Sequence, residues 1–257
     1  MLLAIDVGNT NTVFAVYNKN GEQKGSWRCT THAARTADEY GVFLNQIFML
    51  EGIELKSLSR AIVSSVVPEA NFHLLGFCAK YLKSDPVMVD ANVAGIEVDL
   101  DHPEEVGADR LVNAVAVKAF YKYPVIVIDF GTATTFDVID EKGRYSGGAI
   151  APGINLSIEA LNRAASKLPK VSVKKPPGVI GKNTVSAIQS GIYWGYLGLI
   201  EGLVEKISGE LGAKPFVIAT GGLAPLFAKD TDFIDEVDDN LTLKGLLEIY
   251  KNTKSEG

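Results

Sequence analysis

The sequence contains few of the residues that build disulfide frameworks or metal clusters. Its 257 residues include two cysteines, Cys29 and Cys78, and three widely separated histidines, His32, His73 and His102. No CxxC, HxH or HExxH spacing occurs. Disulfide scaffolds and zinc sites normally show several cysteines or closely spaced histidines. We therefore expect two reduced, structural cysteines and no histidine-based metal site.

Basic clusters and long apolar runs are also missing. Lys and Arg number 25 against 31 Asp and Glu, a net charge of -6, and the densest basic stretch is "KLPKVSVKKPPG". Nucleic-acid-binding domains usually carry a basic face, so we expect no nucleic-acid partner. Polar residues and Pro124 interrupt the longest apolar-looking stretch, 111–128, and Asp6 interrupts the N-terminal one. These interruptions predict a cytoplasmic protein with no signal peptide and no membrane span.

The composition is that of a globular protein, with 47% hydrophobic and 22% charged residues, and the length suits two cores. Short apolar runs and helical spacings alternate along the chain. In the first half they predict strands at 2–7, 12–17, 24–31, 60–67 and 86–90, and helices at 36–52, 69–82 and 107–121. In the second half they predict strands at 125–130, 134–140, 144–151 and 215–220, and helices at 154–168, 182–211 and 242–250. The helix predicted at 182–211 is either continuous or broken between Gly191 and Gly198.

One unit of sequence occurs twice. "LLAIDVGNTNTVFAVYNKNG" begins at Leu2 and "VIVIDFGTATTFDVIDEKG" begins at Val125. An offset of 123 residues pairs Asp6 with Asp129, Gly8 with Gly131 and Thr12 with Thr135, and leaves the turn glycines Gly21 and Gly143 off by one. This period is too long for a solenoid repeat. The repeat predicts two similar domains, 1–113 and 114–257.

Each copy predicts a hairpin whose turn is rich in Gly, Thr or Asn. Several backbone N–H groups in such a turn form a concavity that suits phosphate. The aspartate at the end of the first strand repels phosphate, but it can hold a cation such as Mg²⁺ directly or through water. "GVIGKNT" is not a Walker A loop, because Pro176 and Asn183 stand where glycine and serine or threonine are needed. Together with "VIATGG", the two hairpins predict a phosphate-handling protein.

Six motifs of the sequence, taken together, resemble those of a known protein family. "DVGNTNTVFAVY", "EEVGADRLVNA", "VIDFGTATTFDVID", "GGAIAPGI", "GKNTVSAIQSGIYWGY" and "VIATGGLA" together resemble the type III pantothenate kinases of the acetate- and sugar-kinase, heat-shock-protein and actin superfamily. The resemblance implies two tandem ribonuclease-H-like (actin-like ATPase) α/β domains, each a mixed sheet flanked by helices, with a central cleft. It also implies ATP-dependent phosphorylation of pantothenate at its 4′-hydroxyl, the first step of coenzyme A synthesis, by a homodimer that uses Mg²⁺ and K⁺ or NH₄⁺.

The resemblance also implies roles for particular residues. The ATP-binding motifs match Asp6, Val7, Gly8, Asn9, Thr10, Asn11, Thr12, Val13 and Thr132. The substrate-binding motifs match Leu100, Gly107, Ala108, Asp109, Arg110 and Thr184. Asp109 is the implied catalytic proton acceptor, Asp6 lies near Mg²⁺, and Asp129 is the implied ligand of the monovalent cation. Leu100 departs from the family, because many relatives have a tyrosine there.

The residue types also permit structural roles. Asp109 can cap the helix that follows it, and Thr184 can cap the next long helix. Arg110 can form a forked pair of hydrogen bonds with a substrate carboxylate or a surface ion pair with Glu104 or Glu105.

Two other functions stay open at this stage. One is another small-molecule kinase or phosphatase of the superfamily, such as an exopolyphosphatase, and the other is a regulatory ATP-binding accessory factor. "GADR" favours the pantothenate kinase, and the intact aspartates favour an enzyme.

Overall fold

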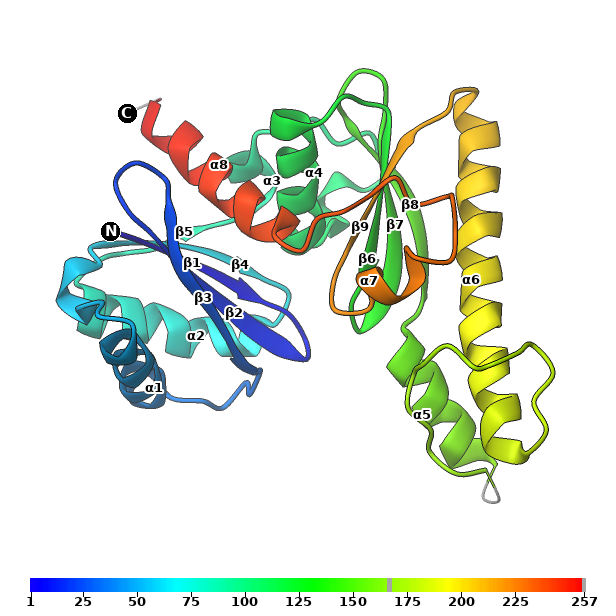
Figure 1. Ribbon diagram of the computed structural model, residues 1–257. Helices are drawn as coiled ribbons and strands as arrows, with labels where there is room; N and C mark the ends of the chain where they lie inside the picture. Colours follow the sequence, from blue (N-terminus) through cyan, green and yellow to red (C-terminus); the bar gives the residue numbers. More distant parts are fainter. Residues whose placement is uncertain (166–167, 256–257) are drawn as a thin grey trace. The chain divides into compact units, whose positions relative to one another are not determined.

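The computed structural model describes residues 1–165 and 168–255 and contains two α/β units, each built on a five-stranded sheet (Figure 1). Met1–Ala119 and Leu241–Ser255 form the first unit, and the described residues of Phe120–Asn240 form the second. Among the helices of these described residues, none is both long and apolar enough to span a membrane.

The first sheet has the strand order β3-β2-β1-β4-β5. β1, β2 and β3 are antiparallel neighbours, whereas β4 runs parallel to β1 and β5 runs parallel to β4. Its strands are β1 (Leu2–Val7), β2 (Asn11–Tyr17), β3 (Gln23–Thr30), β4 (Arg60–Ser65) and β5 (Val87–Met88). The helices of this unit are α1 (Ala37–Leu50), α2 (Pro68–Phe77), α3 (Ala91–Ala94), α4 (Ala108–Phe120) and α8 (Leu241–Ser255), with short helical turns η1 (Leu55–Ser57), η2 (Cys78–Leu82) and η3 (Pro103–Glu105).

The second sheet repeats the first in order and direction, β10-β9-β6-β7-β8, with β9 parallel to β6 and to β10. Its strands are β6 (Val125–Phe130), β7 (Ala133–Ile139), β8 (Tyr145–Pro152), β9 (Phe216–Thr220) and β10 (Glu236–Val237). Its helices are α5 (Ile154–Ala164), α6 (Thr184–Leu211) and α7 (Ala224–Phe227). The repeated mixed sheets confirm the predicted pair of tandem ribonuclease-H-like domains.

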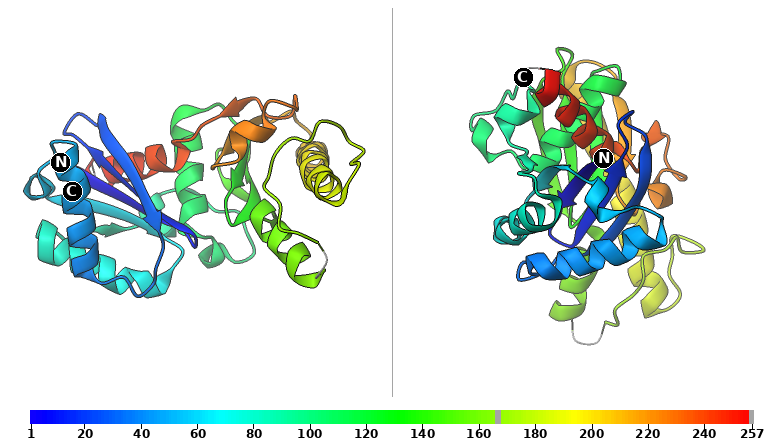
Figure 2. Two further views of the ribbon diagram at one scale, coloured as in Figure 1. Left: turned by 60° about the horizontal axis from the view of Figure 1, so that its bottom comes forward. Right: turned by 90° about the vertical axis from the view of Figure 1, so that its left-hand side faces the viewer.

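Alternation along β1 determines which side chains of the first sheet enter its main core. Leu3, Ile5 and Val7 are fully buried in a cluster with residues of α1 and α2, which run along one face of the sheet (Figures 1 and 2). Because successive residues of a strand point to opposite faces, Asp6 points to the other face. The hydrophobic period therefore keeps the Asp6 carboxylate out of this core.

The C-terminal helix α8 belongs to the first unit, although the sequence prediction assigned residues 114–257 to the second domain. It packs against β1, β4 and α3. Thr242 donates a hydrogen bond from Oγ1 to Asn113 Oδ1 at 2.8 Å. A Cβ added to Gly245 would lie 2.1 Å from the Val112 carbonyl oxygen, so only glycine allows α8 to approach α4 this closely.

The sheet registers correct the alignment of the two hairpins. Thr12 pairs with the last residue of β1, and Thr134 pairs with the last residue of β6, so Thr12 corresponds to Thr134 and not to Thr135. The second turn is one residue shorter than the first. Beyond the turn the offset between the copies is therefore 122 residues, which also brings Gly21 and Gly143 into alignment.

Helix α6 is continuous over 28 residues despite its internal glycines. Each glycine costs about 1 kcal/mol relative to alanine in a helix interior. One face of the helix offsets this cost by burying Tyr193, Leu197, Ile200 and Val204. α5 ends at Ala164, before the predicted end at 168, and residues 166–167 of that prediction lie outside the described residues.

The two free cysteines differ in exposure, and this difference predicts different reactivity. Cys78 is fully buried, and burial raises the pKa of its thiol to about 12, whereas Cys29 is only half-buried. Because the thiolate is the reactive form, we expect iodoacetamide at pH 8 to leave Cys78 of the native protein unmodified and to label it after unfolding in urea. Peptide mass spectrometry would measure this; labelling of native Cys78 at the unfolded rate would contradict it.

Candidate active site

The turn of the first hairpin is held by hydrogen bonds from its own chain. Gly8 N–H donates to the Asn11 carbonyl at 3.0 Å, and Thr31 N–H donates to the Thr10 carbonyl at 2.9 Å. The Thr31 hydroxyl donates to the Gly8 carbonyl at 2.7 Å and lies 2.9 Å from Thr12 Oγ1. Thr12 and Val7 are buried, so their side chains support the turn from within, while Asn9, Thr10 and Asn11 are exposed on it.

The second turn keeps this design with one residue fewer. Gly131 N–H donates to the Ala133 carbonyl at 3.0 Å, and Gly153 N–H donates to the Thr132 carbonyl at 3.2 Å, as Thr31 does in the first hairpin. Gly153 thus replaces Thr31, because a Cβ there would lie 2.1 Å from Thr132 O. Thr132 is exposed at the tip of the turn, where the sequence predicted an ATP contact.

Each aspartate of the repeat has a hydroxyl residue beside it on the next parallel strand. Asp6 pairs in register with Ser64 of β4, and Asp129 pairs with Thr220 of β9. Ser64 and Thr220 are buried, and Ser64 Oγ has no hydrogen-bond partner among the described residues. Neither residue was predicted as part of the site. The signal was a polar residue directly after an apolar run: Ser64 inside the predicted strand 60–67, and Thr220 at the end of the predicted strand 215–220.

The "GADR" segment forms one wall of a cavity of about 460 Å³ in the first unit. The other walls come from the end of β4, the start of α3 and η3, and they include Ser65, Val66, Asp90, Asn92 and Glu104. Of the predicted substrate residues, Gly107 and Ala108 line this cavity. Leu100, Asp109 and Arg110 are half-buried and are not part of its lining.

Asp109 lies in the first turn of α4, not at its cap, because the helix begins at Ala108. Its Oδ1 accepts the backbone N–H of Arg110 at 2.8 Å. A Cβ added to Gly107 would lie 2.6 Å from the same oxygen, so the carboxylate packs against the bare backbone of the cavity wall. The positive end of the helix dipole favours a negative charge at this position.

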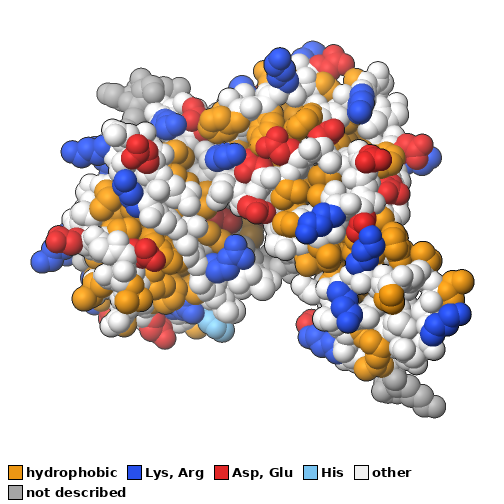
Figure 3. Space-filling model, in the orientation of Figure 1, with side chains coloured by type: hydrophobic (Ala, Val, Ile, Leu, Met, Phe, Trp, Pro, Cys, Tyr) orange, Lys and Arg blue, Asp and Glu red, His pale blue; other side chains and the backbone are white. Residues whose placement is uncertain are grey.

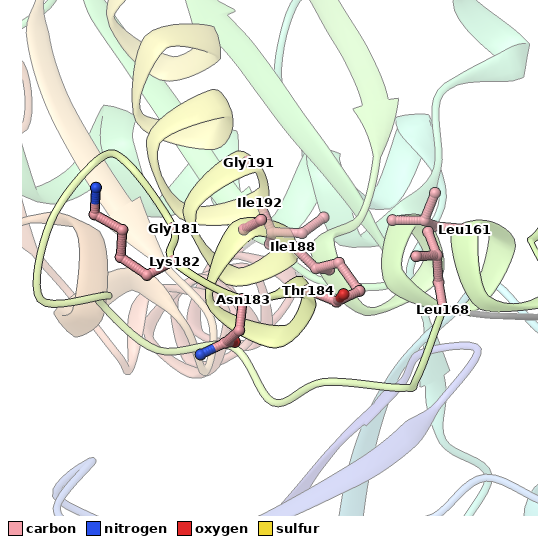
Figure 4. Close-up of a pocket in the computed structure, with 10 residues that line it drawn as sticks. Leu161, Leu168, Gly181, Lys182, Asn183, Thr184, Ile188, Gly191 and Ile192 are labelled. Atoms are coloured by element: carbon pink, nitrogen blue, oxygen red, sulfur yellow. The ribbon is translucent and has the colours of Figure 1, made fainter.

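Thr184 lies in the second unit, at the start of α6. It lines an open cavity of about 650 Å³ together with Gly181, Lys182 and apolar residues of α5 and α6. Figure 4 shows Thr184 and Ile188 facing Leu161 and Leu168 across this cavity. Thr184 is not the helix cap, because Asn183 occupies that position and accepts the Ser186 N–H at 2.9 Å. The Thr184 side chain is therefore not used for capping.

Comparison with known proteins agrees with this geometry. The family model of type III pantothenate kinase matches residues 2–206. The chain belongs to the type III pantothenate kinase family. A member of this family from Paramagnetospirillum magneticum is 57% identical over 99% of this chain and 98% of its own length. Another, from Rhodospirillum rubrum, is 57% identical over the full length of both chains.

The fold of this chain is consistent with its membership of the type III pantothenate kinase family. A solved structure from Sinorhizobium meliloti, described as a 2-dehydro-3-deoxygalactonokinase, superposes with a TM-score of 0.63 over 98% of this chain and 96% of its own. Its sequence identity is 13%, so the similarity concerns the fold. The predicted fold, two tandem α/β domains each built on a mixed five-stranded sheet, is thus confirmed.

Proposed function

We propose that the side chains described above carry out the reaction of a type III pantothenate kinase. The chain transfers the γ-phosphoryl group of ATP to pantothenate in the first step of coenzyme A synthesis. The observation that carries the assignment of roles is the Asp109 carboxylate, which is held at the start of α4 by the Arg110 N–H and packs beside Gly107, a residue of the cavity wall.

Asp109 is proposed to accept the proton of the 4′-hydroxyl. The hydroxyl oxygen forms a bond to the γ-phosphorus, the bond from that phosphorus to the β,γ-bridging oxygen breaks, and the proton passes to the carboxylate. Phosphoryl transfer depends mostly on positioning and on charge neutralisation. The Arg110 N–H holds one oxygen of the carboxylate in place, and we propose that the carboxylate held in this way orients the hydroxyl.

The proposed substrate contacts come from several segments of the chain. In the first unit, Gly107 and Ala108 form the cavity wall, and the Arg110 guanidinium binds the pantothenate carboxylate as a forked pair. Leu100 supplies an apolar contact where many relatives have a tyrosine. In the second unit, the Thr184 hydroxyl binds an amide or an alcohol of the substrate. We also propose that the protein acts in the cytoplasm as a homodimer.

The first hairpin is proposed to hold the phosphates of ATP, with Mg²⁺ near Asp6. The residues fit this ion, because Mg²⁺ prefers oxygen ligands and keeps several waters. Asp6 provides a carboxylate, and the buried Ser64 hydroxyl beside it has no partner among the described residues. When bound, Mg²⁺ would neutralise charge on the phosphates, while the N–H groups of the exposed turn orient them.

The second hairpin is proposed to contact ATP through Thr132 and to hold K⁺ or NH₄⁺ at Asp129. This aspartate is the next-to-last residue of β6 and lies directly opposite Thr135 of β7, so the two side chains share one face of the sheet. Carboxylate and hydroxyl oxygens suit an alkali cation. Lys and Arg are interspersed with Asp and Glu on the face shown in Figure 3, in keeping with small-molecule substrates.

A coupled assay of ADP release tests this function. We expect release to require pantothenate and to increase when K⁺ replaces Na⁺ at constant ionic strength. A panel of other alcohols, sugars and polyphosphate would identify a different kinase or a phosphatase of the superfamily. ATP binding without pantothenate-dependent ADP release would indicate a regulatory ATP-binding factor and would contradict the proposal.

A further inference from the structure

A buried carboxylate lies near Asp129, and the proposed reaction gives it no role. Asp137 of β7 is only 1% exposed. Its Oδ2 accepts a hydrogen bond from the Thr135 hydroxyl at 2.7 Å, and its Oδ1 accepts one from the Tyr145 hydroxyl at 2.8 Å. Burying a carboxylate is costly unless hydrogen bonds compensate it, so its presence inside a sheet calls for an explanation.

The sheet register places this group beside the proposed cation ligand. Asp129 of β6 and Thr135 of β7 are directly opposite each other, which puts their Cβ atoms about 4.5–5.5 Å apart on one face. Asp137 is two residues further along β7, so it lies on the same face. Asp129, Thr135 and Asp137 thus form a continuous row of oxygen-bearing side chains.

The direction of the hydrogen bonds decides what Thr135 can offer. A carboxylate has only acceptors, and a hydroxyl has one hydrogen to give. Since Thr135 donates its hydrogen to Asp137, its remaining lone pairs are available to a cation. We propose that Asp137 is a positioning residue, which holds the Thr135 oxygen as a ligand for the monovalent cation beside Asp129. This proposal rests on the proposed cation role of Asp129.

The first hairpin supports this assignment because it lacks the same pair. Val13 is opposite Asp6 in β2, where Thr135 is opposite Asp129 in β7. Ala15 is opposite Ala4 in β1, where Asp137 is opposite Val127 in β6. The hydroxyl and the buried carboxylate therefore occur together in one copy only, the copy to which the monovalent cation is assigned. A purely structural requirement of the fold would apply to both copies.

Asp137→Asn tests the proposal with little change in shape. Asparagine has one acceptor oxygen and an NH₂ group with two hydrogens. If its NH₂ faces Thr135, the threonine hydrogen turns toward the cation and repels it. We expect the K⁺ concentration for half-maximal thermal stabilisation of the full chain to rise by about tenfold or more, as for second-shell partners of other metals. The K⁺ concentration for half-maximal ADP release should rise in parallel.

Three further variants make the experiment decisive. Thr135→Val should raise the same K⁺ concentrations, and Thr135→Ser should restore them toward the wild-type values. Asp140→Asn is the control, because it removes one negative charge at the far end of the same hairpin. Asp140 forms an ion pair with Arg144 there. The K⁺ response of this variant should match that of wild type. Asp140 lies outside the proposed site. If Asp137→Asn does not fold, the two Thr135 variants decide the test.

The outcomes separate this proposal from the one on which it rests. If wild type responds to K⁺ and Asp137→Asn responds like Asp140→Asn, then Asp137 does not position a cation ligand, although the role of Asp129 stands. If wild-type stability and activity are equal in K⁺ and Na⁺, the cation role of Asp129 is itself wrong, and the proposal for Asp137 is overturned with it.

Discussion

Asp109→Asn is expected to lower kcat for pantothenate phosphorylation by about 10²–10⁴-fold, the range of a positioned general base. The asparagine oxygen can still accept the Arg110 N–H, so α4 keeps its first turn. What is lost is the charge that orients the 4′-hydroxyl and receives its proton. Initial rates of ADP release at saturating pantothenate and ATP would measure the loss.

A control variant shows whether charge alone is responsible. Asp101 is an exposed carboxylate in the preceding loop, and Asp101→Asn removes the same charge outside the proposed site. Its kcat should stay within about twofold of wild type, because Asp101 lies outside the proposed site. Exposed substitutions rarely change the free energy of unfolding by more than about 0.5 kcal/mol, so the variant should also stay folded. Both variants should melt at wild-type temperature. Near-normal turnover by a folded Asp109→Asn protein would rule out the proposed catalytic role.

Gly153→Ala is expected to destabilise the second unit by about 1–3 kcal/mol or more, as overpacked sites do. The added Cβ would lie 2.1 Å from the Thr132 carbonyl oxygen and 2.9 Å from that of Gly131. The turn must then move, and its hydrogen bond from Gly153 N–H must lengthen or break. We therefore expect a lower urea midpoint and weaker ATP binding by calorimetry.

Gly178→Ala is the matched control for this substitution. A Cβ at Gly178 meets no atom within 4 Å, and no positive φ is recorded there. Its urea midpoint and ATP affinity should match those of wild type. If Gly153→Ala also leaves both quantities unchanged, the second turn does not depend on the close approach of these two backbone segments.

The strands and hairpins could be predicted because their signals are local. The short apolar runs Leu2–Ile5 and Val125–Ile128, each followed by Asp-x-Gly, determine β1 and β6, and Asn20-Gly21 marks the turn before β3. The position of α8 could not be predicted in this way. Its attachment to the first unit depends on the contact between Gly245 and Val112, which are far apart in sequence. An amphipathic pattern predicts that a helix has an apolar face, but it does not predict which sheet that face covers.

The residues of the candidate site also differ in whether a local sequence signal predicts them. The Asp-x-Gly turns and "GADR" are contiguous motifs, so the sequence alone predicted Asp6, Asp109 and Asp129. Ser64 and Asp137 became candidates only from strand register, which places residues of different segments side by side. An alignment by constant offset also paired Thr12 with Thr135, because a fixed offset cannot represent a turn that is shorter by one residue.

The return of α8 to the first unit has a consequence for synthesis on the ribosome. Tyr17 donates its hydroxyl hydrogen to the Leu243 carbonyl, a bond between residues 226 positions apart, and burial raises the pKa of Tyr17 to about 12, so the hydrogen is retained. The first unit cannot complete the packing against β1 and β4 until α8 has been synthesised. Phe120–Asn240, by contrast, is one uninterrupted segment. The part of the chain that is translated first is therefore the part that finishes folding last.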